Sequence, residues 1–154
     1  MLRSPLALAA MFVLFTLQAC QDTTVPGGTA GTFALRDIAS TALPVTYYSG
    51  TDGTYTVLAD TIELDGAGNV NRTFLIRRTA SIYGADTVYR NRGVQEYRLD
   101  GTRIEIGSFK PCPPDALCAA NDTGRFYGGV MRLGSFRTGQ LRRWSYDRIA
   151  PLPQ

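Results

Sequence analysis

Alternating apolar and polar residues dominate the chain after residue 31, and a period of two is the pattern of half-buried β-strands. The clearest candidates are rich in β-branched and aromatic residues and occupy residues 55–64, 70–78, 94–99 and 103–106. Further candidates cover residues 32–36, 45–48, 86–91, 125–133 and 140–148. Helical spacing of apolar residues is not convincing anywhere beyond the first 19 residues. The pattern therefore predicts an all-β domain.

Turn-forming residues separate these candidates. The strongest signals are Asp65-Gly66 and Asp100-Gly101, each between two alternating segments. Gly128-Gly129 lies inside the candidate strand 125–133, where we expect a bulge or bend that lets the sheet curl. These connections predict an antiparallel up-and-down meander of about eight strands, forming a small barrel or a sandwich. The alternation alone does not decide which face of each strand points inward.

The first 19 residues differ from the rest of the chain and predict a signal peptide. Arg3 supplies a short positive region, and an almost wholly apolar run follows from Leu6 to Leu17. That run is too short for a typical membrane-spanning helix, which needs about 20 apolar residues. The alternative, a buried N-terminal helix, is disfavoured by the charge before the run and the cleavage site after it.

Leu17-Gln18-Ala19-Cys20 resembles the bacterial lipobox. The resemblance implies cleavage before Cys20 and acylation of that cysteine, which makes the membrane a partner through a lipid anchor. Two or three acyl chains hold a protein stably on a bilayer. Gln21 follows, where Asp tends to retain Gram-negative lipoproteins in the inner membrane, so we expect a lipid-anchored protein of the cell envelope, at the outer membrane. The alternative is an ordinary secreted protein in which Cys20 is coincidental.

The chain therefore divides into three regions. Residues 1–19 are the expected lipoprotein signal peptide, and residues 20–31 are a polar tether rich in Gly, Thr and Pro that we expect to be flexible. Residues 32–150 are expected to form a single β domain, which is long enough to bury an adequate core.

Composition removes several classes of function. The chain holds 16 basic and 13 acidic residues, and Arg3 is the only one of them in the leader. This nearly neutral balance gives no reason to expect nucleic acid as a partner. The chain has no histidine, which excludes Ser-His-Asp and Cys-His catalysis. We expect no cofactor and no metal.

The carboxylates of the strand candidates do not suggest catalysis. No spacing among Asp60, Glu63, Asp86, Glu96 and Glu105 implies the facing pair that hydrolysis by two carboxylates needs. Asp60 and Glu63 point to opposite faces of one strand. We expect solvated strand charges, because acids are rarely buried, and a protein that is not an enzyme.

Two cysteines remain if Cys20 carries a lipid. Cys112 and Cys118 lie close together in a segment with three prolines, which favours an irregular loop. Outside the cytoplasm such a pair predicts a disulfide. A metal site is the alternative, but the sequence has neither histidine nor a second cysteine pair to complete it.

Short segments across residues 31–149 resemble the lipocalin-like domains of small bacterial lipoproteins and, more loosely, lipocalins. The resemblance rests on four pieces, which are Gly31-Thr32-Phe33, Ala59 to Gly66, Tyr97 to Ile104, and Trp144 to Arg148. It implies a barrel that can hold one small apolar ligand. It also implies that Arg148 packs over the ring of Phe33 and helps to close the barrel, with solvent exposure of Arg148 as the alternative.

The last strand candidate carries alternating arginine and aromatic residues. Arg142, Trp144, Tyr146 and Arg148 share one face of it and are candidates for binding a ligand or a surface polymer. We favour a stacked ladder that covers the barrel exterior, because cross-strand stacks are ordinary stabilisers of sheets.

Two classes of function stay open. A ligand carrier would hold an apolar molecule in the barrel, and the family resemblance favours it slightly. A structural or protein-interaction module of the envelope would have a core filled by large side chains and no cavity.

Overall fold

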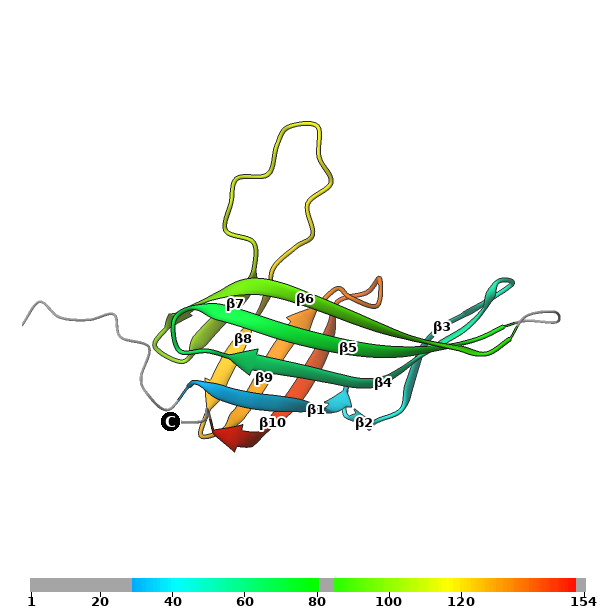
Figure 1. The fold of residues 1–154 in the computed structure, drawn as a ribbon, viewed down its shortest axis with the longest axis horizontal. Helices are drawn as coiled ribbons and strands as arrows, with labels where there is room; N and C mark the ends of the chain where they lie inside the picture. The colour runs from blue at the N-terminus through cyan, green and yellow to red at the C-terminus, as the bar shows by residue number, and fades with distance from the viewer. Residues whose placement is uncertain (1–28, 81–84, 152–154) are drawn as a thin grey trace, which may run out of the picture.

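The computed structural model describes residues 29–80 and 85–151, and regular structure within them is all β-strand. The ten strands are β1 (Gly31–Ile38), β2 (Thr41–Ala42), β3 (Val45–Gly50), β4 (Gly53–Leu64), β5 (Asn69–Thr79), β6 (Thr87–Asp100), β7 (Arg103–Gly107), β8 (Asp122–Tyr127), β9 (Val130–Ser135) and β10 (Arg142–Pro151). They follow one another in a single antiparallel sheet, in the order β2-β1-β10-β9-β8-β7-β6-β5-β4-β3 (Figure 1). No helix in the described ranges is long and apolar enough to cross a membrane.

Strand β1 closes this sheet because it pairs with two other strands. Its whole length pairs with β10, from Gly31 opposite Pro151 to Ile38 opposite Trp144. Its first four residues also pair with β4, where Phe33 lies opposite Ile62. Eight strands, β1 and β4 to β10, therefore form a closed antiparallel barrel, with β2 and β3 as additional strands (Figure 1). The predicted all-β meander is confirmed, and of the two predicted arrangements the barrel is correct.

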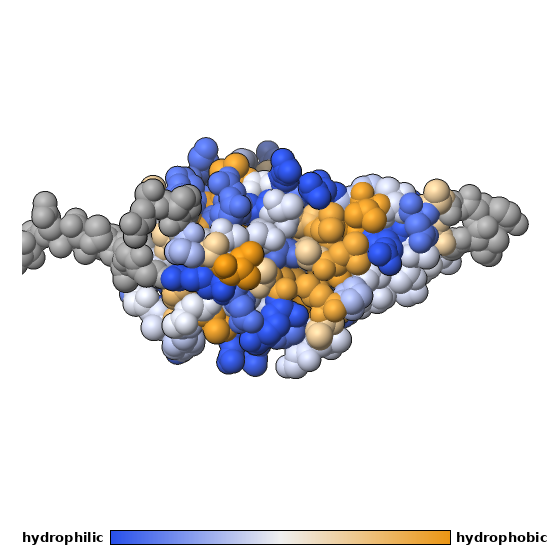
Figure 2. Space-filling view, turned by 60° about the horizontal axis from the view of Figure 1, so that its bottom comes forward, coloured by the Kyte–Doolittle hydropathy of each residue, from blue (hydrophilic) through white to orange (hydrophobic). Residues whose placement is uncertain are grey.

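Large side chains fill the barrel. Trp144, Tyr146 and Phe33 are the largest of its fully buried side chains, and buried apolar residues of β4 to β7 and of β9 belong to the same core. Burying each large apolar side chain contributes about 1.5–3 kcal/mol to folding. The exterior is mixed, and Figure 2 shows apolar patches interrupted by hydrophilic side chains on one face.

A bulge in β4 decides which of its residues face inward. The pairing of β4 with β5 shifts register between Val57 and Ala59, so an extra residue interrupts the alternation. Val57 is fully buried, and after the bulge Asp60 and Ile62 are the buried residues. The prediction that Asp60 is solvated is therefore wrong, because an uninterrupted period of two from Val57 would have turned it outward.

Two strand boundaries also differ from the prediction. The candidates 86–91 and 94–99 form one strand, β6, whose exposed first half lacks alternation but pairs continuously with β5. The candidate 125–133 is instead two strands, because Gly128 and Gly129 form the tight turn between β8 and β9. Both glycines have positive φ angles, 51° and 95°, which a two-residue hairpin turn requires.

The described part of the chain begins with a buried residue, and a disulfide closes one of its loops. Thr29 is only 5% exposed and β1 begins at Gly31, so the packed domain starts slightly before residue 32. Cys112 and Cys118 are bonded at 2.15 Å, with 5.9 Å between their Cα atoms, so the predicted pairing is confirmed. Their loop projects from the barrel between β7 and β8 (Figure 1). The signal peptide, Cys20 and most of the tether lie outside the described residues.

Candidate functional site

A network of charged and polar side chains crosses the barrel interior. Its members are Asp60 on β4, Arg72 on β5, Asp122 at the start of β8 and Tyr146 on β10. All four side chains are buried, and their residues are between 0% and 5% exposed. Side chains from four strands of the barrel thus form one polar cluster.

Arg72 makes most of the contacts in this network. Its Nε donates to both carboxylate oxygens of Asp60, at 3.0 and 2.9 Å, and its Nη2 also donates to Asp60 Oδ2. Its Nη1 donates to Asp122 Oδ2 at 2.6 Å, and Nη2 donates to the Tyr146 hydroxyl at 2.9 Å. The Tyr146 hydroxyl in turn donates to Asp60 Oδ2 at 2.8 Å. A buried charge is tolerated only with such pairing, because an isolated one loses its hydration.

A second arginine completes the charge balance at the rim. Arg137 Nε donates to Asp122 Oδ2 at 3.4 Å, and its Nη2 donates to Gln95 Oε1 at 3.0 Å. Its side chain is 32% exposed, so the network reaches solvent at this end. Two arginines and two aspartates make the network neutral as a whole.

The titration of Arg72 reflects the competing effects in this setting. Burial disfavours the charged guanidinium and would lower its pKa. The oxygen of Tyr146 and the carboxylates of Asp60 and Asp122 outweigh burial, so the pKa of Arg72 is raised. The guanidinium is therefore a permanent cation at the centre of the barrel.

Aromatic rings pack beside the network. The Cζ atom of Arg72 lies 5.8 Å from the centre of the Trp144 ring, and the Trp144 and Phe74 rings are 5.6 Å apart. The buried Nε1 of Trp144 has no hydrogen-bond partner among the described residues, so this ring acts mainly through packing. Large side chains thus occupy the space beside the ion pairs.

The opposite part of the barrel holds the predicted contact between Arg148 and Phe33. These residues lie opposite each other on β10 and β1, and the Cζ atom of Arg148 is 5.2 Å from the Phe33 ring centre. The same guanidinium lies 5.7 Å from the ring of Phe126 on β8. The predicted contact is present, at the seam where β1 closes the barrel.

The prediction of an exterior ladder on β10 is wrong. Trp144 and Tyr146 are fully buried, so the face that they share with Arg148 points into the barrel, whereas Arg142, the first residue of β10, is only partly buried and lies at the surface. Neither ring is available to bind a surface polymer. The period of two grouped Trp144, Tyr146 and Arg148 correctly, but this face of β10 points inward, because the other strands of the closed barrel cover it.

Removing the hydroxyl of Tyr146 tests the network directly. The substitution Tyr146→Phe should lower the free energy of unfolding by about 1–3 kcal/mol, because Asp60 loses a donor and Arg72 an acceptor in a buried site. Urea unfolding followed by Trp144 fluorescence measures this. The substitution Tyr48→Phe is the control, since Tyr48 is 47% exposed and should show almost no change.

The same tyrosine gives the stability a dependence on alkaline pH. Burial and the neighbouring Asp60 carboxylate raise the pKa of Tyr146 well above its ordinary value of 10.0. Its contribution to stability is therefore complete below that pH and is lost as the pH rises above it, because only the unfolded chain ionises readily there. The unfolding free energy of Tyr146→Phe should fall less steeply above pH 10 than that of the wild type. Equal slopes would contradict this assignment.

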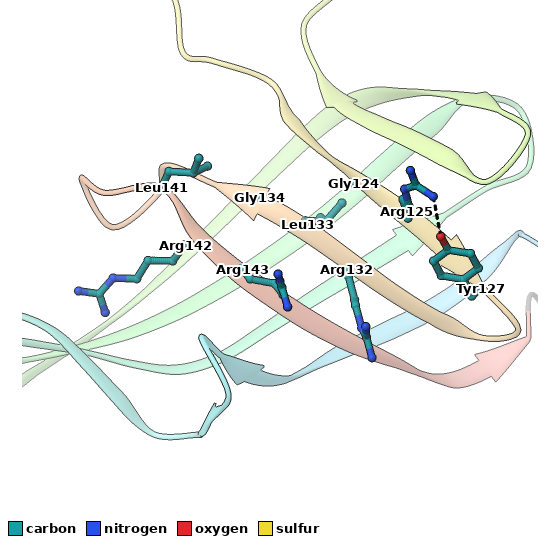
Figure 3. A pocket seen from close by; sticks show the side chains of 9 residues that line it. All are labelled: Gly124, Arg125, Tyr127, Arg132, Leu133, Gly134, Leu141, Arg142 and Arg143. Atoms are coloured by element: carbon teal, nitrogen blue, oxygen red, sulfur yellow. Dashed lines mark hydrogen bonds between the residues drawn. The ribbon is translucent and has the colours of Figure 1, made fainter.

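A second feature lies on the outside, over β8, β9 and β10. An open groove of about 610 Å³ is lined by arginines of β8, β9 and β10, together with Tyr127 and Leu141. Figure 3 shows Arg132 and Arg143 extending side by side from β9 and β10, and Arg125 turned toward Tyr127. Arg125 Nη1 donates to the Tyr127 hydroxyl at 3.0 Å. We call this feature the arginine groove, after its arginines Arg125, Arg132, Arg142 and Arg143.

The described residues contain no group of three or more His, Cys, Asp or Glu side chains that could hold a metal ion. Comparison of the chain with protein-family models, with curated proteins and with solved structures found no significant match.

Neither the buried network nor the arginine groove was predicted from the sequence, because both bring together residues that are far apart along the chain. Arg72 alternates with Phe74 and Ile76 on one face of its segment. A charge on this otherwise apolar face was the available sign that Arg72 could be buried. Asp122 begins a strand after a long loop, and nothing in its local sequence links it to Arg72. The arginine groove needs the register of three strands, which no local pattern contains.

Proposed function

We propose that this chain is a non-enzymatic lipoprotein of the cell envelope, whose lipocalin-like domain acts through its exterior and does not carry apolar cargo. The lipobox-like segment that ends at Cys20 supports the envelope location, at the outer membrane. Residues 20–31 would span at most about 40 Å when fully extended, which keeps the domain near the membrane surface.

The filled interior is the observation that carries the proposal. A small barrel of eight strands either packs its interior with side chains or leaves room for one ligand. Here Trp144, Tyr146 and the Arg72 ion pairs occupy the middle of the barrel. An apolar ligand at this place would have to displace paired charges, and an unpaired buried charge is strongly unfavourable.

Native mass spectrometry of the exported, detergent-purified chain tests both the lipid anchor and the absence of an apolar ligand. We expect a mass that corresponds to the mature chain with lipid on Cys20, two hydrogens below the reduced form, and no further ligand. The variant Cys20→Ser should lack the lipid mass. A co-purifying apolar molecule that is lost on denaturation would make the carrier function correct instead, and an unmodified Cys20 would remove the anchor.

A further inference from the structure

Arginines occupy neighbouring positions on three adjacent strands at the outer face of the barrel. Arg103 on β7 lies directly opposite Arg125 on β8, and Arg125 lies directly opposite Arg132 on β9. On β10, Ser145 is opposite Arg132, and Arg143 precedes Ser145 by two positions. The row of Arg103, Arg125 and Arg132 therefore leads into the arginine groove.

None of these arginines has an acidic partner within the described residues. The ion pairs there involve Arg36, Arg72 and Arg137, and none involves Arg103, Arg125, Arg132 or Arg143. Asp100 on β6 lies directly opposite Arg103, and Glu105 follows on β7, but neither carboxylate forms an ion pair with Arg103, and Glu105 accepts a hydrogen bond from Asn121. No carboxylate lines the groove either.

The arginines of the row repel one another. Like charges directly opposite each other on adjacent strands destabilise a sheet, and here two such pairs share Arg125. The positive potential also acts on Tyr127, because the hydrogen bond from Arg125 lowers the pKa of its phenol and the charge of Arg132 adds to this. An anion in the groove would remove the repulsion.

We propose that the arginine groove binds a multiply charged phosphate group, such as a phosphomonoester or a diphosphate. Guanidinium groups bind phosphate oxygens with paired, charge-assisted hydrogen bonds. Side chains from β8, β9 and β10 reach the groove, and a tetrahedral anion can accept bonds from several directions, unlike a planar carboxylate. This deepens the proposed function, on which it rests for the envelope setting, by naming a ligand class for the exterior.

Thermal unfolding of the full chain in neutral detergent tests the proposal with pyrophosphate as the probe. We expect the melting temperature to rise by several degrees as pyrophosphate is added at constant ionic strength, since a ligand of the folded state stabilises it. Sodium chloride should weaken the effect, because the arginines are exposed. Calorimetry under the same conditions gives the dissociation constant.

The triple variant Arg103→Gln, Arg125→Gln and Arg132→Gln should lose the response to pyrophosphate, with binding at least tenfold weaker. Its melting temperature without ligand should equal or exceed that of the wild type, because the substitutions remove repulsion. The variant Arg77→Gln, Arg90→Gln and Arg92→Gln is the matched control, since it removes the same charge from exposed positions of β5 and β6. Absence of a pyrophosphate response in the wild type, or equal loss in both variants, overturns the proposal.

Such a phosphate group can belong to a lipid headgroup or to a soluble molecule, and mixed micelles distinguish these two sources. If the group belongs to a lipid headgroup, phosphatidic acid in the micelle should stabilise the wild type and not the triple variant, and phosphatidylcholine should stabilise neither. If pyrophosphate stabilises the wild type but not the triple variant, and phosphatidic acid stabilises neither, the ligand is a soluble phosphate. A co-purifying cargo in the barrel would contradict the proposed function and leave this binding unaffected.

Discussion

The substitution Arg72→Met is expected to lower the free energy of unfolding by about 3–5 kcal/mol, because it leaves two buried carboxylates without their cation. Asp60 would lose its bidentate partner, and among the described residues Asp122 would keep only the side-chain contact with Arg137 at 3.4 Å. Methionine fills a similar volume, so the loss comes from the charges and not from a cavity. Urea unfolding followed by the fluorescence of Trp144 measures it.

Two further variants separate the ion pairs from a general sensitivity of the barrel. Arg90→Met makes the same exchange on an exposed residue of β6 and should change stability little. Adding Asp60→Asn and Asp122→Asn to Arg72→Met removes the stranded charges and should recover part of the loss. If Arg72→Met and Arg90→Met were equally stable, the network would have no structural role and would not oppose an apolar ligand in the barrel.

The substitution Trp144→Ala is expected to destabilise the protein by a similar amount, about 3–5 kcal/mol, because it opens a cavity in a close-packed core. Trp144 is fully buried and packs against Phe74 and the guanidinium of Arg72. It is also the only tryptophan of the chain, so unfolding must be followed by circular dichroism. Phe136→Ala is the control, since Phe136 is an exposed aromatic residue.

The cavity in Trp144→Ala also reports on the proposed function. An apolar cavity of this kind binds small aromatic molecules, so indole should stabilise the variant and leave the wild type unchanged. This outcome would show that the barrel excludes apolar ligands because Trp144 occupies the space. Stabilisation of the wild type by indole would instead indicate an existing cavity and favour a carrier.

The fold was largely predictable because its signals are local. A period of two, the Asp-Gly turns and the absence of helical spacing are properties of neighbouring residues, and they suffice for an antiparallel meander. The pairing of Cys112 with Cys118 and the contact of Arg148 with Phe33 were also anticipated, the first from spacing and the second from the resemblance to lipocalins.

The error on β10 has a simple physical origin, which is that an alternating pattern has two faces and does not say which of them is inside. The pattern grouped Trp144 with Tyr146 correctly but was assigned to the exterior, and the bulge after Val57 reversed the face of Asp60. Gly128-Gly129 has the composition of both a bulge and a hairpin turn, and only the pairing of β8 with β9 distinguishes them.

The sequence by itself determined an all-β domain, its Asp-Gly turns, its disulfide and the lipobox-like segment, because each depends on residues close together along the chain. Tertiary structure alone decided the closure of the barrel, since β1 must meet β4 and β10 across most of the domain. It also brought Arg72 to Asp122 and aligned Arg103, Arg125 and Arg132, because strand register places distant residues opposite one another.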